Sequence, residues 1–220
     1  SIIVPANSAV GGGYAVDNSC RFNSGSSDKL TKTYASSGNR VKWTWSSWIK
    51  RSEIASTNRI FGVYQNASYN TTCYISGGGN LVFIDTYTGA EQARAQTNMV
   101  FRDISAWYHI VVVYDKDNAT SADKLILYVN GEIASLSSYT APTQATTWNV
   151  DGLAMEIGAY NSADYFSGYL SEITFIDGTA NAVTDFGEFD ENSGIWKPID
   201  VSELTFGGNG FYLPFENSAA

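Results

Sequence analysis

The nearest match to a pair of catalytic carboxylates is Glu188-Phe-Asp190-Glu191, close to the C-terminus. Enzymes that hydrolyse β-glucans carry their carboxylates on one face of a strand, in an E-x-D-x-(x)-E pattern, and retaining chemistry needs them about 5–5.5 Å apart. Glu188 and Asp190 would share a face, but no third carboxylate follows at the required spacing, and Gly187 and Gly194 flank the segment. The pattern therefore predicts a solvated acidic turn.

The single histidine, His109, and the isolated Glu172 are the other candidates for acid–base chemistry. A nucleophilic triad or a zinc site needs partners at defined spacing, and the sequence contains no HExxH, G-x-S-x-G or Cys/His cluster. His109 is therefore expected to be structural. Glu172 stands alone in SGYLSEITF and is expected to face solvent or to cap a loop. We expect the protein not to be an enzyme.

Aromatic side chains in polar loops indicate carbohydrate binding instead. Proteins hold sugars by stacking aromatic rings on the C–H-rich faces of pyranoses, while short polar side chains fix the hydroxyls. Trp48, on the polar face of its predicted strand, is expected to join a concave platform. The alternative is that the tyrosines only bridge core and solvent at strand ends. The predicted glycan-binding residues are Trp48, Tyr64, Tyr69, Tyr87, Tyr160, Asn161, Asp164 and Tyr165.

Three aspartates, Asp115, Asp117 and Asp123, gather in and beside the polar loop DKDNATSAD. Calcium takes oxygen ligands from loops of this kind, but the spacing of an EF-hand is absent. An exposed acidic loop is favoured over a calcium site. No cofactor is expected to be required, and Ca²⁺ is kept as the alternative.

The charge balance limits the partners. Thirteen basic and 22 acidic residues give a net charge of −9 over 220 residues. No basic stripe is present to neutralise phosphates, which argues against nucleic acid and anionic membranes. No run approaches the roughly 18 apolar residues of a membrane helix, and the start SIIVPANSAVGGG lacks the features of a signal peptide. Cys20 and Cys73 are expected to be small buried hydrophobes, with a disulfide as the alternative.

Short β-rich runs separated by turn signals must position these residues. Residues 107–115 are apolar on both faces, which predicts a central strand between two layers. The partner run 123–130 ends in Asn130-Gly131, a pair that favours a type I′ hairpin turn. The stretch before Trp107 is expected to be a polar loop. Further strands are expected at 20–22, 30–34, 41–50, 59–64, 73–76, 81–85, 155–157 and 168–177, loops at 65–72 and 135–152, and a helical turn or two at 181–186.

The strand pattern alone predicts an all-β fold, most simply two stacked antiparallel sheets. In addition, the pieces CRFN, TWSSWIKRS, RIFGVY, WYHIVVVYD, KLILYVNGE and FSGYLSEITFIDG follow one another across roughly residues 18–178. In this order they resemble the laminin-G-like branch of the concanavalin A-like lectin/glucanase superfamily. The resemblance implies an antiparallel two-sheet β-sandwich, a concanavalin A-like jelly roll, at residues 18–180. An N-terminal arm (1–17) and a C-terminal extension (181–220) that packs on the sandwich or on a neighbouring subunit would flank it.

Two C-terminal pieces, DFGEFDENSGIWKPI and GGNGFYLPFENSA, are similar to segments found beside this domain in virion proteins of environmental tailed phages. This resemblance implies a non-catalytic, lectin-like module that binds a glycan on a host or environmental surface and contacts other virion proteins. It implies a location on the virion surface after assembly in the host cytoplasm, and a homotrimer, since phage appendages are commonly trimeric. The alternatives are a structural capsid-decoration or fibre protein without glycan binding, and a glycan-degrading glucanase.

Overall fold

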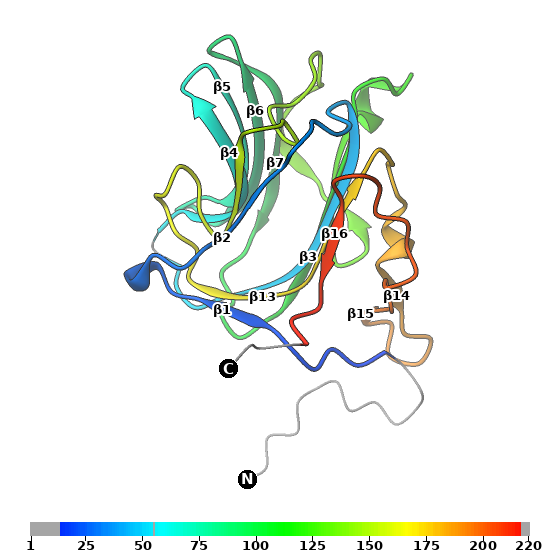
Figure 1. Cartoon of the computed structure of the whole chain (residues 1–220). Coiled ribbons are helices and arrows are strands. Elements are labelled where there is room, and N and C mark those ends of the chain that lie inside the picture. The colour runs from blue at the N-terminus through cyan, green and yellow to red at the C-terminus, as the bar shows by residue number, and fades with distance from the viewer. Residues whose placement is uncertain (1–13, 55, 217–220) are drawn as a thin grey trace.

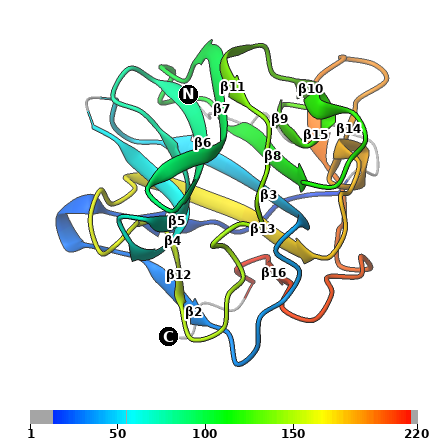
Figure 2. The same cartoon turned by 90° about the horizontal axis from the view of Figure 1, so that it is seen from above.

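The computed structural model describes residues 14–54 and 56–216, so most of the predicted N-terminal arm lies outside the described residues. Two antiparallel sheets pack face to face, and a small third sheet lies beside one of them (Figures 1 and 2). The predicted all-β, two-sheet sandwich is confirmed. No helix of the described residues is long and apolar enough to span a membrane.

The first sheet, sheet A, is built around β3 and β8. Its strand order is β1-β13-β3-β8-β9-β10, and β16 pairs with β13 beyond the end of β1. β8 is buried along its whole length, as its two apolar faces predict. The strands of sheet A are β1 (Cys20–Phe22), β3 (Lys42–Arg51), β8 (Tyr108–Asp115), β9 (Leu125–Val129), β10 (Glu132–Ile133), β13 (Gly168–Asp177) and β16 (Phe211–Leu213).

The second sheet, sheet B, has the order β11-β7-β6-β5-β4-β12-β2. It carries the hairpins that present most of the predicted glycan-binding tyrosines. Its strands are β2 (Leu30–Thr33), β4 (Asn58–Asn66), β5 (Tyr69–Ile75), β6 (Asn80–Tyr87), β7 (Ala90–Val100), β11 (Leu136–Thr140) and β12 (Ala154–Ile157).

Three segments that were expected to be loops contain strands. β5 begins inside the expected loop 65–72, β7 fills the polar stretch before Trp107, and β11 lies within 135–152. The pattern misses β7 because the residues that it turns to the core are the small Ala93 and Ala95, which lack a β-branched or aromatic signature. β7 is held instead by its place between β6 and β11.

The predicted turn after β9 is confirmed by its backbone. Asn130 and Gly131 have φ values of 50° and 84°, as a type I′ turn requires at both central positions. The turn returns the chain antiparallel to β9 as β10.

The two sheets enclose an aromatic core. Trp43 and Trp45 project into it from β3, as the alternation of that strand predicts. Trp148, from the connection after β11, lies against them, with ring centroids 4.9 Å from Phe61 and 5.4 Å from Phe175. The core therefore joins residues from both sheets and from a long connection.

The two cysteines lie in different sheets and are both free. Cys73 is fully buried in the core, and Cys20 is half-buried at the edge. The structure thus favours the small-hydrophobe interpretation over a disulfide.

The C-terminal segment covers the outer face of sheet A. Val111 and Val113 of β8 pack there against Phe186 and Val201. After η3 (Val183–Asp185), the strands β14 (Gly187–Phe189) and β15 (Trp196–Pro198) form the small third sheet. Figures 1 and 2 show β14 and β15 on the side of sheet A that faces away from sheet B. The loop 158–166 lies over part of the outer face of sheet B, where Tyr160 contacts Tyr64 and Arg59.

Candidate functional site

The outer face of sheet B carries four flat side chains in a row. Arg59 of β4 lies opposite Tyr74 of β5 in the strand register, and Tyr64 lies further along β4. Alternation turns Tyr64 and Tyr74 outward while Val63 and Cys73 enter the core. A register shift between Arg59 and Phe61 brings Arg59 to the same outer face. Tyr160 reaches the same face from the loop 158–166. We call this group the tyrosine row; in spatial order it consists of Tyr64, Tyr160, Arg59 and Tyr74.

The members of the row contact one another directly. The rings of Tyr64 and Tyr160 meet edge to face, with centroids 5.5 Å apart and planes at 79°. The guanidinium carbon of Arg59 lies 4.8 Å from the ring centre of Tyr160 and 4.2 Å from that of Tyr74. Such cation–π contacts contribute about 0.5–2 kcal/mol each. The row is therefore held in place without a ligand.

The loop 158–166 is fastened over the sheet at separate points. Glu156 of β12 accepts hydrogen bonds from the backbone N–H of Ser162, at 3.0 Å, and from its hydroxyl, at 3.2 Å. Asp164 accepts from Nη2 of Arg59 at 3.0 Å. The backbone is left-handed at three residues of the loop, with φ values of 53° at Asn161, 52° at Ser162 and 48° at Asp164. Asn and Asp tolerate this region better than most residues. These contacts place Tyr160 on the face.

Gly62 of β4 makes room for the Tyr160 ring. A Cβ atom at Gly62 would lie 2.7 Å from Cδ2 of Tyr160, too close for two carbon atoms. We expect Gly62→Ala to displace Tyr160 and to cost about 1–3 kcal/mol of unfolding free energy through overpacking. Burial raises the pKa of Tyr160 to about 12, so displacement should also return this phenol toward its ordinary pKa.

Chemical denaturation and ultraviolet titration of the tyrosines measure these two effects. Gly78→Ala is the matched control, because a Cβ there meets only ordinary contacts, the nearest at 3.4 Å. Equal stabilities and equal tyrosine titration curves for the two variants would contradict the role of Gly62.

The structure separates the predicted glycan-binding residues. Tyr64, Tyr160 and Asp164 lie together, with the exposed Asn161 and the half-buried Tyr165 in the same loop. Sequence reasoning missed Arg59 and Tyr74. The signal for Tyr74 was its position between Cys73 and Ile75, whose burial turns it outward. No sequence signal paired Arg59 with a loop one hundred residues later in the chain.

Tyr69 and Tyr87 form a second, separate pair. They lie opposite each other on β5 and β6, with ring centroids 5.1 Å apart at 88°. They share the alternation phase of Cys73 and Phe83, which face the core, so they cover the end of the sandwich interior. They do not lie in the tyrosine row.

Trp48 lies on the other sheet. It projects from the outer face of sheet A and stacks on His109, with ring centroids 4.9 Å apart. Trp196 of the C-terminal segment also stacks on His109, with ring centroids 6.0 Å apart. Trp48 therefore does not join the tyrosines in one platform.

His109 is buried, and both of its ring nitrogens are hydrogen-bonded within the protein, which supports the expected structural role. Nε1–H of Trp196 donates to Nδ1 of His109 at 2.9 Å, so the ring proton sits on Nε2 and is donated to Oγ of Ser46 at 2.8 Å. Burial lowers the pKa of His109 to about 3, which keeps the ring neutral.

The acidic loop does not gather its aspartates. Asp115 is buried and pairs with Lys42 at 3.0 Å, Asp117 pairs with Lys116, and Asp123 is exposed. Among residues 14–54 and 56–216, no three Asp, Glu, His or Cys side chains form a group that could hold a metal ion.

The candidate catalytic pair near the C-terminus lies in an acidic turn. Glu188 and Asp190 both contact Nζ of Lys197, at 3.2 and 3.3 Å. The turn thus carries a small ion-pair network at the surface.

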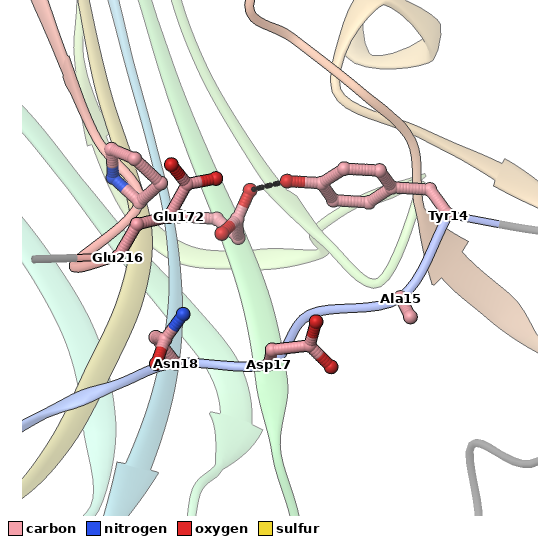
Figure 3. Close-up of a pocket in the computed structure, with 7 residues that line it drawn as sticks. Tyr14, Ala15, Asp17, Asn18, Glu172 and Glu216 are labelled. Atoms are coloured by element: carbon pink, nitrogen blue, oxygen red, sulfur yellow. Dashed lines mark hydrogen bonds between the residues drawn. The ribbon is translucent and has the colours of Figure 1, made fainter.

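The expectation that Glu172 faces solvent is wrong. Its side chain is buried, and the hydroxyls of Tyr14 and Tyr212 both donate to Oε2. Glu172 lies where the register between β13 and β3 shifts, at a φ of 50°, and the terminal segments that carry Tyr14 and Tyr212 cover its side chain. Burial raises the pKa of this carboxyl group. It borders a pocket of about 250 Å³ that Asp17 and Glu216 also line (Figure 3).

The two face-to-face antiparallel sheets define a β-sandwich of the concanavalin A-like type. The family model described as the concanavalin A-like lectin/glucanases superfamily matches residues 23–183. The chain belongs to this superfamily. No curated protein matches its sequence.

Solved structures share the fold at low identity. The CBM40 domain of the Ruminococcus gnavus IT-sialidase is 13% identical, with a TM-score of 0.50, covering 71% of this chain and 95% of its own. A heptameric SAP-like pentraxin of Limulus polyphemus is 16% identical, with a TM-score of 0.49, covering 70% of this chain and 71% of its own. Tailspike protein 2 of an Escherichia coli bacteriophage is 13% identical, with a TM-score of 0.47, covering 76% of this chain and 23% of its own. At this identity the likeness to the CBM40 domain shows the β-sandwich fold alone.

Proposed function

We propose that this protein is a non-catalytic carbohydrate-binding module that holds a glycan against the outer face of sheet B. The observation that carries the proposal is the tyrosine row. It places three half-buried tyrosine rings side by side on the open sheet face, next to a half-exposed carboxylate. Rings stack on the C–H faces of pyranoses and short polar groups fix their hydroxyls, so the row has the composition of a sugar platform.

The charges on this face support a binding role without catalysis. Asp164 is paired with Arg59, and Glu156 is paired with Lys29. Glycoside hydrolysis needs one carboxylic acid and one carboxylate that both reach the scissile bond. Burial raises the pKa of Glu156, but the hydrogen bonds from Lys29 and Ser162 outweigh it and hold the pKa below its usual value, so Glu156 is a poor proton donor.

The virion setting is part of the same proposal and rests on the resemblance of the C-terminal segments. According to this proposal, the module lies on a phage surface as a homotrimer. There it binds a host or environmental glycan and contacts other virion proteins. The exposed apolar side chains of Ile133 and Ile195, 68% and 66% accessible, support a contact with another subunit or protein beside β10 and β15. The purely structural alternative, a decoration or fibre protein, rests on these same residues.

A glycan array followed by calorimetric titration of the best ligand tests the binding role. We expect saturable binding that Tyr64→Ala or Tyr160→Ala weakens about tenfold, the effect of losing roughly 1.4 kcal/mol of stacking energy. Tyr169→Ala is the matched control, because Tyr169 lies on sheet A beside Trp107. The affinity of Tyr169→Ala for the glycan should equal that of the unchanged protein. EDTA should not change glycan binding.

Three outcomes would contradict parts of this proposal. A lack of binding to every bacterial and algal glycan tested, together with tight incorporation into virions, would favour the structural alternative. Release of reducing sugar from a bound glycan would establish an enzyme. Loss of binding in EDTA would make calcium a required cofactor.

A further inference from the structure

Three basic side chains reach the outer face of sheet B, and each of them is ion-paired. Arg59 pairs with Asp164 and Arg94 with Glu91, both at 3.0 Å, and Lys29 pairs with Glu156. The side chains of Lys29, Arg59 and Arg94 are only 27%, 15% and 23% accessible. The face therefore has no net charge from these pairs, and it belongs to a chain with a net charge of −9.

The guanidinium group of Arg59 has little left to offer an anion. Nε and Nη2 donate to Oδ2 of Asp164, at 3.3 and 3.0 Å, and Nη1 donates to Oγ1 of Thr72 at 3.3 Å. The guanidinium carbon also lies 4.2 Å from the ring centre of Tyr74 and 4.8 Å from that of Tyr160, and the side chain is only 15% accessible. Carboxylates and sulfates of acidic sugars are recognised by free arginine forks or lysines, and Arg59 is not free.

Asp164 presents the opposite chemistry. Its side chain is 50% accessible, and Arg59 occupies only Oδ2. Oδ1 has no hydrogen-bond partner among the described residues. An ionised carboxylate oxygen only accepts, so Oδ1 suits the O–H donors of a neutral sugar and repels an anionic one. Arg59 holds Oδ2 of Asp164 and also contacts the ring of Tyr160, on which the sugar would stack.

We propose, resting on the binding role proposed above, that the tyrosine row selects uncharged, hydroxyl-rich glycans over acidic ones. Asp164 is the residue that determines this selectivity. It does so in two ways: it neutralises Arg59, and it offers Oδ1 to sugar hydroxyls. Sialylated, uronic-acid and sulfated glycans are excluded because the only cation in the row is already occupied.

The test compares neutral and anionic polysaccharides on the full chain. Binding of laminarin, mannan and arabinan is measured beside binding of alginate and polygalacturonate, at low salt, by affinity electrophoresis or calorimetry. The unchanged protein should bind at least one neutral polysaccharide and no anionic one. Asp164→Asn keeps the shape and the left-handed backbone but frees the charge of Arg59. It should weaken neutral binding severalfold and create anionic binding, at least tenfold above the unchanged protein.

Glu91→Gln is the matched control. It removes the same charge from the same face and frees Arg94, but it lies on β7, three strands away from β4. It should leave neutral binding unchanged and gain less anionic binding than Asp164→Asn. The selectivity proposal is overturned if the unchanged protein binds alginate as well as a neutral glycan, or if both variants gain anionic binding equally. If neither class binds to the unchanged protein, the binding role itself fails, and the selectivity proposal fails with it.

Discussion

Replacing Trp196 with alanine is expected to lower the free energy of unfolding by about 3–5 kcal/mol, the usual cost of removing a large buried aromatic side chain. Trp196 is 7% accessible, and its ring covers both Gly131, at the turn after β9, and Gly187, at the start of β14. It also stacks on His109. The substitution would open a cavity between sheet A and the C-terminal segment.

The loss also has a polar component. Without the indole N–H, Nδ1 of His109 stays buried and unsatisfied, which adds about 1–3 kcal/mol to the cost of the substitution. Trp196→Phe restores most of the packing but not this hydrogen bond, so its destabilisation should be intermediate. Urea denaturation followed by tryptophan fluorescence and circular dichroism measures all three proteins.

Ile195→Ala is the control for Trp196, because the neighbouring side chain is 66% accessible. Its effect should stay within about 0.5 kcal/mol, as for most surface substitutions. If Trp196→Ala were no more harmful than Ile195→Ala, the C-terminal segment would contribute no stability to the sandwich.

Asp85→Asn is expected to stabilise the protein at neutral pH. Asp85 is completely buried, and its Oδ2 has no hydrogen-bond partner among the described residues. Oδ1 accepts from the hydroxyl of Thr71 and, at 3.1 Å, from the backbone N–H of Thr147. Burial is the largest cause that raises the pKa of Asp85, from 3.8 to about 6.

The sign of the effect follows from this shift. Because the folded pKa lies above the unfolded one, the stability that Asp85 contributes is fully present below about pH 4 and is lost as pH rises through about 6. A shift of roughly two pKa units corresponds to about 3 kcal/mol. Asparagine mimics the protonated carboxyl group, so Asp85→Asn should match the unchanged protein near pH 4. At pH 8 the free energy of unfolding of Asp85→Asn should exceed that of the unchanged protein by up to about 3 kcal/mol.

Denaturation of both proteins at several pH values between about 4 and 8 measures the difference between their free energies of unfolding. The titration of all other groups cancels in this difference. Asp123→Asn, at an exposed aspartate, is the control for the removal of one negative charge outside the core. A constant difference between Asp85→Asn and the unchanged protein at every pH would contradict a raised pKa at Asp85.

Much of the fold was predictable because its signals are local. Alternation in β3 predicted that Trp43 and Trp45 enter the core, and the two apolar faces of β8 predicted a central strand. The pair Asn130-Gly131 predicted the turn between β9 and β10. β7 and β11 were not predictable in this way, because their side chains are small or polar and pairing with neighbouring strands holds them in the sheet.

The candidate site could be predicted only in part. The sequence by itself determined the class of fold, the family and a supply of tyrosines in polar loops. Only the tertiary structure decided that Tyr64 and Tyr160 meet, that Arg59 lies between Tyr160 and Tyr74, and that Trp48 belongs to the other sheet. The physical reason is that strand alternation assigns a side chain to a face, whereas the contact of a strand with a distant loop depends on sheet order and on close approach. Here the approach requires Gly62, whose missing side chain leaves the space that Tyr160 fills.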